Sequence, residues 1–295
     1  MNNFIDFKKD RNFDQVLQDG FNFLKYNFKS IIKYFWQLNT LWIILFVLFS
    51  LFYVYFTLNK FSTAFSDLNN GTIENPNKFD GVNLIYTFFI WFFTFRIYLT
   101  VFGYIHSYIT NHGEVKIEDI QEFIEQKNFL KYAGLSIIIS FMVILGLILL
   151  IIPGIWVLVP VSLMIPAFFL DTDSISEAID KGFSYAKHNW WFSFGILLVM
   201  IIVILFISYL INIPIIIYAM SKTIIAIKDS NSDAITGIVK DPVIIFFSFL
   251  STLLRYFLVL IQISIGTVLY YTVKERHTGV GSLEKLEQLK NENDL

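Results

Sequence analysis

Two arginines, Arg96 and Arg255, are the residues of this sequence best suited to bind a ligand. Arg96 lies in the stretch FTFRIY and Arg255 in the stretch LLRYF, both inside long apolar runs. A guanidinium group is permanently charged, and its planar fork of donors matches a phosphate or a carboxylate. A charge at the centre of a membrane costs about 2.5–3.5 kcal/mol, so charged residues there usually serve a function. The sequence therefore predicts an anion- or lipid-binding site at these two arginines, which would face the same interior region.

A second interpretation of Arg96 and Arg255 is purely structural. If their helices extend past the bilayer, each guanidinium group can reach a headgroup or bind the carbonyls of a kinked neighbouring helix. No Asp or Glu falls inside the apolar runs, so neither arginine has an obvious carboxylate partner there. The sequence leaves both interpretations open.

The other polar residues do not form the pattern of an active site or a metal site. His106, His112, His188 and His277 lie near the ends of apolar runs and lack metal-ligand spacing. The chain has no cysteine, which excludes disulfides and thiol catalysis. Nucleophile-elbow, phosphate-loop and dinucleotide motifs are absent. We therefore expect no catalytic residues, no cofactor and no metal.

The composition is that of a membrane protein. Hydrophobic residues fill 56% of the 295 positions and charged residues 16%, whereas soluble domains are about half apolar and about a quarter charged. The net charge of −2 provides no general attraction to nucleic acid. We therefore expect an all-α, polytopic membrane protein whose partners include membrane lipids and exclude nucleic acid.

Six apolar runs are long enough to cross a bilayer core, which takes roughly 20 helical residues. The third and fourth are separated only by Pro153-Gly154, which predicts a tight hairpin turn. The fourth contains Pro160 and Pro166, which predict a kinked or shallow span, with a re-entrant segment as the alternative. The predicted spans are residues 38–58, 82–109, 130–152, 154–170, 190–218 and 242–273.

The distribution of Lys and Arg predicts the orientation, because these residues are enriched on the cytoplasmic side. With the N-terminus inside, fifteen of them fall in cytoplasmic segments and five in outer loops. Both termini, and the segments around Glu118 and Asp180, are therefore predicted to be cytoplasmic. The first apolar run begins near Leu38, behind a charged leader, so no cleaved signal peptide is expected.

A nine-residue pattern occurs twice, as GFNFLKYNF at residues 20–28 and as GFSYAKHNW at residues 182–190. Around both copies, apolar residues recur at helical spacing opposite polar ones, which predicts amphipathic helices lying in the membrane interface before a span. We expect the glycine of each copy to allow close packing. The matched residues are Gly20, Phe21, Lys25 and Asn27 in the first copy, and Gly182, Phe183, Lys187 and Asn189 in the second.

The pattern extends to a parallel internal repeat within a single membrane domain. A third, fainter amphipathic helix around Ile117, Ile120 and Ile124 precedes the third span. Each repeat unit would be an amphipathic helix followed by two spans, unlike the inverted repeats of many transporters. The alternative is that the matches arose by chance, since many polytopic proteins carry such helices. The predicted units are residues 12–109, 115–170 and 174–273, followed by a charged cytoplasmic tail at 274–295.

The stretch IIPGIWVLVPVSLMIPAFFLDTDSISEAIDKGFSYAKHNWW, residues 151–191, resembles the central signature of a bacterial six-helix membrane family. In that family a Pro-Gly hairpin, a short span, an acidic linker and an amphipathic helix follow in this order. The stretch VLYYTVKERHTGVGSLEKLEQL, residues 268–289, resembles the family's aromatic-rich last span and its charged exit helix. The family's domain is fused to some glycerophosphodiester phosphodiesterases and also occurs alone.

The resemblance implies a six-helix architecture in the bacterial cytoplasmic (inner) membrane. It does not imply phosphodiesterase activity, because the soluble catalytic barrel of the fused relatives has no counterpart in this chain. That barrel has a His-Arg motif with acidic metal ligands. Here Arg276-His277 has the reverse order, and no acidic cluster accompanies it.

Two classes of function fit the sequence. The first is a non-enzymatic membrane subunit or scaffold that binds lipid, and also a protein partner through its amphipathic helices and tail. The second is a transporter or lipid-handling protein with a central anion site at Arg96 and Arg255. The first is favoured because proton- and cation-coupled carriers usually place acidic residues inside their spans.

Single cysteines test the predicted orientation. Cysteines introduced at Asn70 and Ser230 should react from outside in intact cells, because both positions lie in predicted outer loops. A cysteine at Asn291, in the predicted cytoplasmic tail, should not react. Labelling at Asn291 would overturn the orientation.

Overall fold

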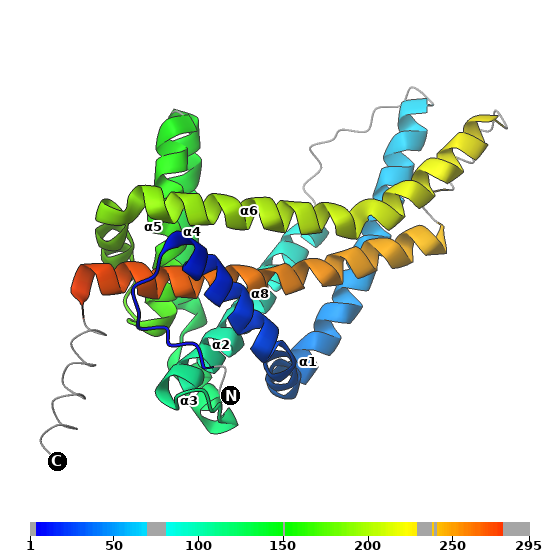
Figure 1. Cartoon of the computed structure of the whole chain (residues 1–295). Coiled ribbons are helices and arrows are strands. Elements are labelled where there is room, and N and C mark those ends of the chain that lie inside the picture. Colours follow the sequence, from blue (N-terminus) through cyan, green and yellow to red (C-terminus); the bar gives the residue numbers. More distant parts are fainter. Residues whose placement is uncertain (1–3, 70–80, 150, 229–237, 239–240, 280–295) are drawn as a thin grey trace, which may run out of the picture. The chain divides into compact units, whose positions relative to one another are not determined.

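The computed structural model describes residues 4–69, 81–149, 151–228, 238 and 241–279 (Figure 1). Within these residues the chain is almost entirely helical and contains no strand, which confirms the all-α class. The helices are α1 (Phe13–Asn69), α2 (Gly81–Thr110), α3 (Ile117–Gln126), α4 (Phe129–Leu149), α5 (Ile151–Leu170), α6 (Ile175–Lys228) and α8 (Pro242–Thr278).

Six of the described helices contain stretches that are long and apolar enough to cross a membrane. This confirms a multi-pass membrane architecture at the level of length and composition. The membrane that holds the chain and the side on which its termini lie stay predictions. The six stretches are Phe13–Lys60, Gly81–Thr110, Phe129–Ile148, Ile152–Leu170, Ile175–Ile225 and Pro242–Thr278.

Two helices extend into segments that the sequence predicted as polar outer loops. Helix α1 continues to Asn69 and α6 to Lys228, although loops were expected at 59–81 and 221–241. Polar residues mark where a helix leaves the apolar layer and do not by themselves end it. The labelling positions Asn70, Ser230 and Asn291 lie outside the described residues.

The predicted tight hairpin between the third and fourth spans is present, but its turn does not fall on Pro153-Gly154, because α5 already begins at Ile151. Proline is tolerated in the first turn of a helix, where its missing N–H has no intrahelical partner to lose. Helix α5 also continues through Pro160 and Pro166 as one element. Helices α4 and α5 pack side by side as a hairpin (Figure 1).

Helices α1 and α6 each bend at an asparagine. The backbone leaves helical geometry at Asn39 (φ −128°, ψ 18°) and at Asn189 (φ −121°, ψ 23°). These dihedral angles make Asn39 and Asn189 equivalent in backbone conformation. Each bend divides its helix into a leading part and a longer part. Asn27, which corresponds to Asn189 in the nine-residue pattern, lies in regular helix.

The chain divides into two units by internal contacts. The larger unit takes its described residues from Met1–Leu38, Phe95–Ile202 and Leu260–Leu295. The smaller unit comprises Asn39–Thr94 and Val203–Val259.

Each unit has an aromatic core of its own. In the larger unit Phe102 stacks on Phe169, with ring centroids 4.8 Å apart. In the smaller unit Phe46 stacks on Phe93 at 4.0 Å, and Tyr256 meets Phe46 edge-on at 4.7 Å. Offset and edge-to-face pairs of this kind stabilise beyond the area that they bury.

The leading part of α1, residues 13–38, packs against protein along one face. Val16, Phe23 and Ile31 are buried there. The predicted apolar stripe also included Phe21 and Phe28, but these two are exposed. The stripe is therefore split between a face that packs on the larger unit and a face that stays open.

The leading part of α6, residues 175–188, runs antiparallel along α5. Lys181 donates to the carbonyl of Asp171, near the end of α5, at 3.2 Å. Phe183 lies near Trp156, at the start of α5, with ring centroids 6.1 Å apart. Tyr185 and Ala186 are both buried. Protein thus covers much of the apolar face that was expected to meet lipid.

Glycines permit the closest approaches of both leading parts. A Cβ at Gly182 would lie 2.5 Å from Met164 Cγ and 2.8 Å from the Pro160 carbonyl oxygen. A Cβ at Gly20 would lie 2.9 Å from the Cα of Ile265 on α8. Backbone atoms cannot move aside as a flexible side chain can, so any larger residue forces the helices apart.

Helix α3 is held against the end of α2. Ile120 and Phe123 are its buried residues. The Asp119 carboxylate accepts hydrogen bonds from the Ser107 hydroxyl at 2.7 Å and from the Asn111 amide at 2.6 Å. These bonds stabilise the ionised form and lower the pKa of Asp119 below its ordinary value.

Alanine substitutions at two glycines test the close packing. Gly182→Ala should lower the melting temperature in detergent by several degrees, because overpacking typically costs about 1–3 kcal/mol. Gly266→Ala is the matched control: a Cβ there would meet nothing within 4 Å, so its melting temperature should not fall. Ser184→Ala is a poorer control, because the Ser184 hydroxyl lies 3.2 Å from His277 Nε2. Equal melting temperatures of the two alanine variants would contradict a packing role for Gly182.

Candidate functional site

A pocket of about 740 Å³ lies beside the bend of α6 at Asn189. We call it the bend pocket. Its lining combines tryptophans with basic side chains, and no acidic residue is found among the described residues that line it. The tryptophans and basic residues are Trp156, Lys187, His188, Trp190, Trp191 and Arg276.

Trp190 fixes the wall of the bend pocket. Its indole N–H donates to the carbonyl of Trp156 on α5 at 3.0 Å, and its ring stacks on Phe194 at 4.9 Å. Trp191 meets Trp190 in a T-shaped contact, with ring centroids 4.7 Å apart. Since an indole has one donor and Trp190 uses it here, the junction of α5 and α6 is held in one arrangement.

The three basic residues of the bend pocket are all exposed, and two of them lie on α6. Lys187 and His188 occupy the last two positions before the bend. Within the part of the chain that the structure describes, neither side chain makes a hydrogen bond or an ion pair. Their donors are therefore available to a ligand.

The third basic side chain, Arg276 of α8, is held in place by protein. Its Nε donates to the Asp10 carboxylate at 2.6 Å, and its Nη2 donates to the carbonyl of Arg11 at 2.6 Å. The guanidinium carbon lies 3.9 Å from the centroid of the Phe192 ring. A cation stacked on an aromatic face and paired on its edge is well ordered.

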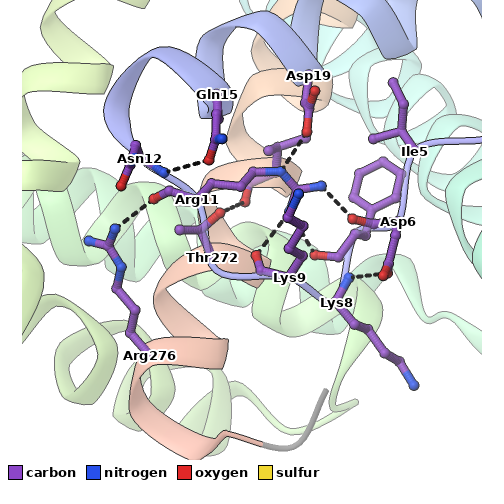
Figure 2. A network of polar contacts seen from close by, with 12 residues as sticks. Ile5, Asp6, Lys8, Lys9, Arg11, Asn12, Gln15, Asp19, Thr272 and Arg276 are labelled. Carbon is purple, nitrogen blue, oxygen red and sulfur yellow. Dashed lines mark hydrogen bonds and ion pairs between the residues drawn. The ribbon is translucent and has the colours of Figure 1, made fainter. Parts of the chain in front are cut away.

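Arg276 thereby joins the bend pocket to a polar network around Arg11 (Figure 2). Arg11 is only 2% exposed. It donates to the Asp19 carboxylate at 2.8 Å and to the carbonyls of Phe7 at 3.1 Å and Lys9 at 3.0 Å. A buried charge is tolerated only when it is paired and hydrogen-bonded, and this network meets that condition.

The segment before α1 is also fixed by apolar contacts. The Phe7 ring is 1% exposed and meets the rings of Phe23 at 5.2 Å and Tyr271 at 5.8 Å. The Ile5 amide donates to the Tyr108 hydroxyl at 2.9 Å. Residues 5–12 therefore belong to the folded larger unit, although the sequence predicted only a charged leader there.

A second polar cluster uses the acidic linker between α5 and α6. The Asp171 carboxylate accepts from the Tyr270 hydroxyl at 2.7 Å and from Lys274 Nζ at 2.6 Å. Lys127 pairs with Asp173. These contacts tie α3, α5 and α8 together, so the linker serves the fold and not the pocket.

The structure places Arg96 and Arg255 in different units. Arg96 is partly buried and its Nη2 donates to the carbonyl of Leu38, just before the bend of α1, at 3.4 Å. Arg255 is exposed and its Nη2 donates to Asn212 Oδ1 at 3.3 Å. Arg96 thus binds a carbonyl of a kinked helix, which is what the structural interpretation expects. A shared anion site stays a prediction.

The two copies of the nine-residue pattern have different surroundings. In the second copy, Lys187 and Asn189 line the bend pocket. In the first copy, Lys25 is exposed on α1. The Asn27 amide donates to the Phe23 carbonyl at 2.9 Å, and its carbonyl oxygen accepts from the Tyr104 hydroxyl at 2.8 Å.

Sequence reasoning singled out Lys187 and Asn189 but missed the rest of the bend pocket. Arg276 was considered as a residue of the charged exit stretch and as half of a reversed catalytic motif, and not as a ligand-binding residue. The cluster of aromatics at Trp190 and Trp191 was the available signal, because tryptophans beside lysines often mark a membrane interface. Among the described residues, no group of three or more His, Asp or Glu is placed to hold a metal ion.

Comparison of the chain with models of protein families, with curated proteins and with solved structures found no match. The resemblance to the membrane domain of phosphodiesterases therefore stays a prediction.

Proposed function

We propose that this protein is a non-enzymatic membrane subunit or scaffold that binds an anionic phospholipid in the bend pocket. The observation that carries the proposal is the joint presence of Lys187, His188 and Arg276 beside three tryptophans at the bend of α6. Basic pockets between membrane helices suit lipid headgroups. Tryptophan prefers the headgroup level of the bilayer, where its ring is partly apolar and its N–H is polar.

The charges favour an anionic headgroup over a zwitterionic one. Lys187 and His188 have no partner within the described residues, and only Asp10 opposes Arg276. Basic groups near an anionic membrane surface contribute about 1 kcal/mol each. The volume of about 740 Å³ falls in the range of small-molecule sites, which is about 300–1,000 Å³.

The lining supports binding and not catalysis. The described residues that line the bend pocket include no serine, threonine or carboxylate, so His188 has no nucleophile or acid to act with. A scaffold role further requires a protein partner. The exposed Phe21 and Phe28 of the leading part of α1, together with the part of the charged tail that follows α8, are the proposed docking elements on the cytoplasmic side of the bacterial inner membrane.

Lipid-dependent stability tests the proposed function. Phosphatidylglycerol should raise the melting temperature of the purified wild-type protein by several degrees, because a ligand that binds the folded state stabilises it by mass action. Phosphatidylcholine should do so less. In the double variant Lys187→Gln and His188→Gln, the two lipids should have equal effects.

Lys25→Gln is the matched control for the lipid test. Lys25 occupies the same position of the nine-residue pattern as Lys187 and is also exposed, but it does not line the bend pocket. This variant should respond to phosphatidylglycerol as the wild type does. If the double variant also keeps the full response, the bend pocket does not bind the lipid.

The alternative function is a transporter or lipid-handling protein with a central anion site. It rests on Arg96 and on Arg255, whose only hydrogen-bond partner within the described residues is Asn212. If the two arginines share an anionic lipid, Arg→Gln at either position should lower the melting temperature only when anionic lipid is present. Arg→Lys should restore part of the effect, since lysine keeps the charge but lacks the planar fork. An equal loss without lipid would favour the structural interpretation.

A further inference from the structure

A second cavity of about 450 Å³ lies in the larger unit between α2, α5, α6 and α8. We call it the chain cavity. Its lining is mostly apolar, and representative residues are Phe102, Val161, Leu197 and Ile263. One of its few polar groups, the Ser162 hydroxyl, already donates to the carbonyl of Val159 at 2.7 Å. A cavity with this lining favours an apolar ligand.

The linings of the bend pocket and the chain cavity meet at Phe194. On α6 the bend pocket is lined from Lys187 to Phe194, and the chain cavity from Phe194 onwards to Ile202. On α5 the bend pocket takes Trp156 and its neighbours, and the chain cavity starts at Leu158. Phe194 lines both spaces and is stacked on Trp190 at 4.9 Å.

We infer that the two spaces hold a single phospholipid, with its phosphate in the bend pocket and one acyl chain in the chain cavity. This inference rests on the proposed function and adds the site of the chain. Lys187 and Arg276 provide the charge that a phosphate requires. Phe194 lies at the boundary, where the polar headgroup of a phospholipid gives way to its hydrocarbon.

The covalent link between headgroup and acyl chain distinguishes this site from ordinary contact with bulk lipid. A chain that is tethered to a bound headgroup enters the chain cavity as an intramolecular event, at high effective concentration. Loss of either space should therefore weaken the binding of the whole lipid. A short-chain lipid with the same headgroup should depend only on the bend pocket.

Gly266→Leu tests the chain cavity. Gly266 lines it, and a Cβ there would meet nothing within 4 Å, so the new side chain can fill the space without a backbone clash. Binding of dioleoyl-phosphatidylglycerol, counted by native mass spectrometry, should weaken by about tenfold, because the chain loses its apolar contacts. Binding of dihexanoyl-phosphatidylglycerol should not change. Ile165→Phe fills the same cavity from α5 and replaces Gly266→Leu if that variant does not fold.

The outcomes separate this inference from the proposed function. If Lys187→Gln with His188→Gln weakens both lipids while neither cavity-filling variant affects the long-chain lipid, the chain site is wrong and the bend pocket stands. Oleate alone could also bind the wild type and lose this binding in Gly266→Leu but keep it in Lys187→Gln with His188→Gln. In that case the two spaces hold separate ligands and the inference is overturned. If phosphatidylglycerol has no effect on the wild type, the proposed function fails and the chain site fails with it.

Discussion

The bend of α6 at Asn189 is the constraint on which the architecture of the larger unit depends. It allows residues 175–188 to run back along α5, while Trp190 stays bonded to the carbonyl of Trp156. Gly182 makes this return possible, because its missing side chain leaves room for the backbone of Pro160. The bend pocket forms at the point where α6 turns away from α5, so the same contacts that shape the fold also shape the site.

Much of the fold could be predicted from the sequence, because long apolar runs directly determine which segments are membrane helices. The ends of the helices could not, since polar residues after Leu58 and Ser221 are compatible with continued helix. Pro153 was misassigned because proline has the same local signature in a turn and in the first turn of a helix. The bend at Asn39 was not predicted, because Asn39 lies outside the nine-residue pattern and no local signal in the sequence marks it.

The candidate site was predictable only in part, because its residues come from segments that are far apart in the sequence. Lys187 and Asn189 belong to a local pattern, whereas Arg276 reaches the bend pocket from α8 and Trp156 from α5. Likewise, Arg11 looked like one charge of a polar leader, and only its contacts with Asp19 and with backbone carbonyls explain its burial. Contacts between distant segments decide both cases, and single-sequence patterns do not contain them.

The contacts of Arg276 connect the bend pocket to the N-terminal segment. One guanidinium group holds Asp10 and the Arg11 carbonyl while it also faces the bend pocket. An anion that draws Arg276 away from Asp10 loosens the segment before α1. By thermodynamic reciprocity, docking of the segment weakens the binding of that anion by the same factor. Binding of such an anion and docking of the segment before α1 would then be coupled equilibria.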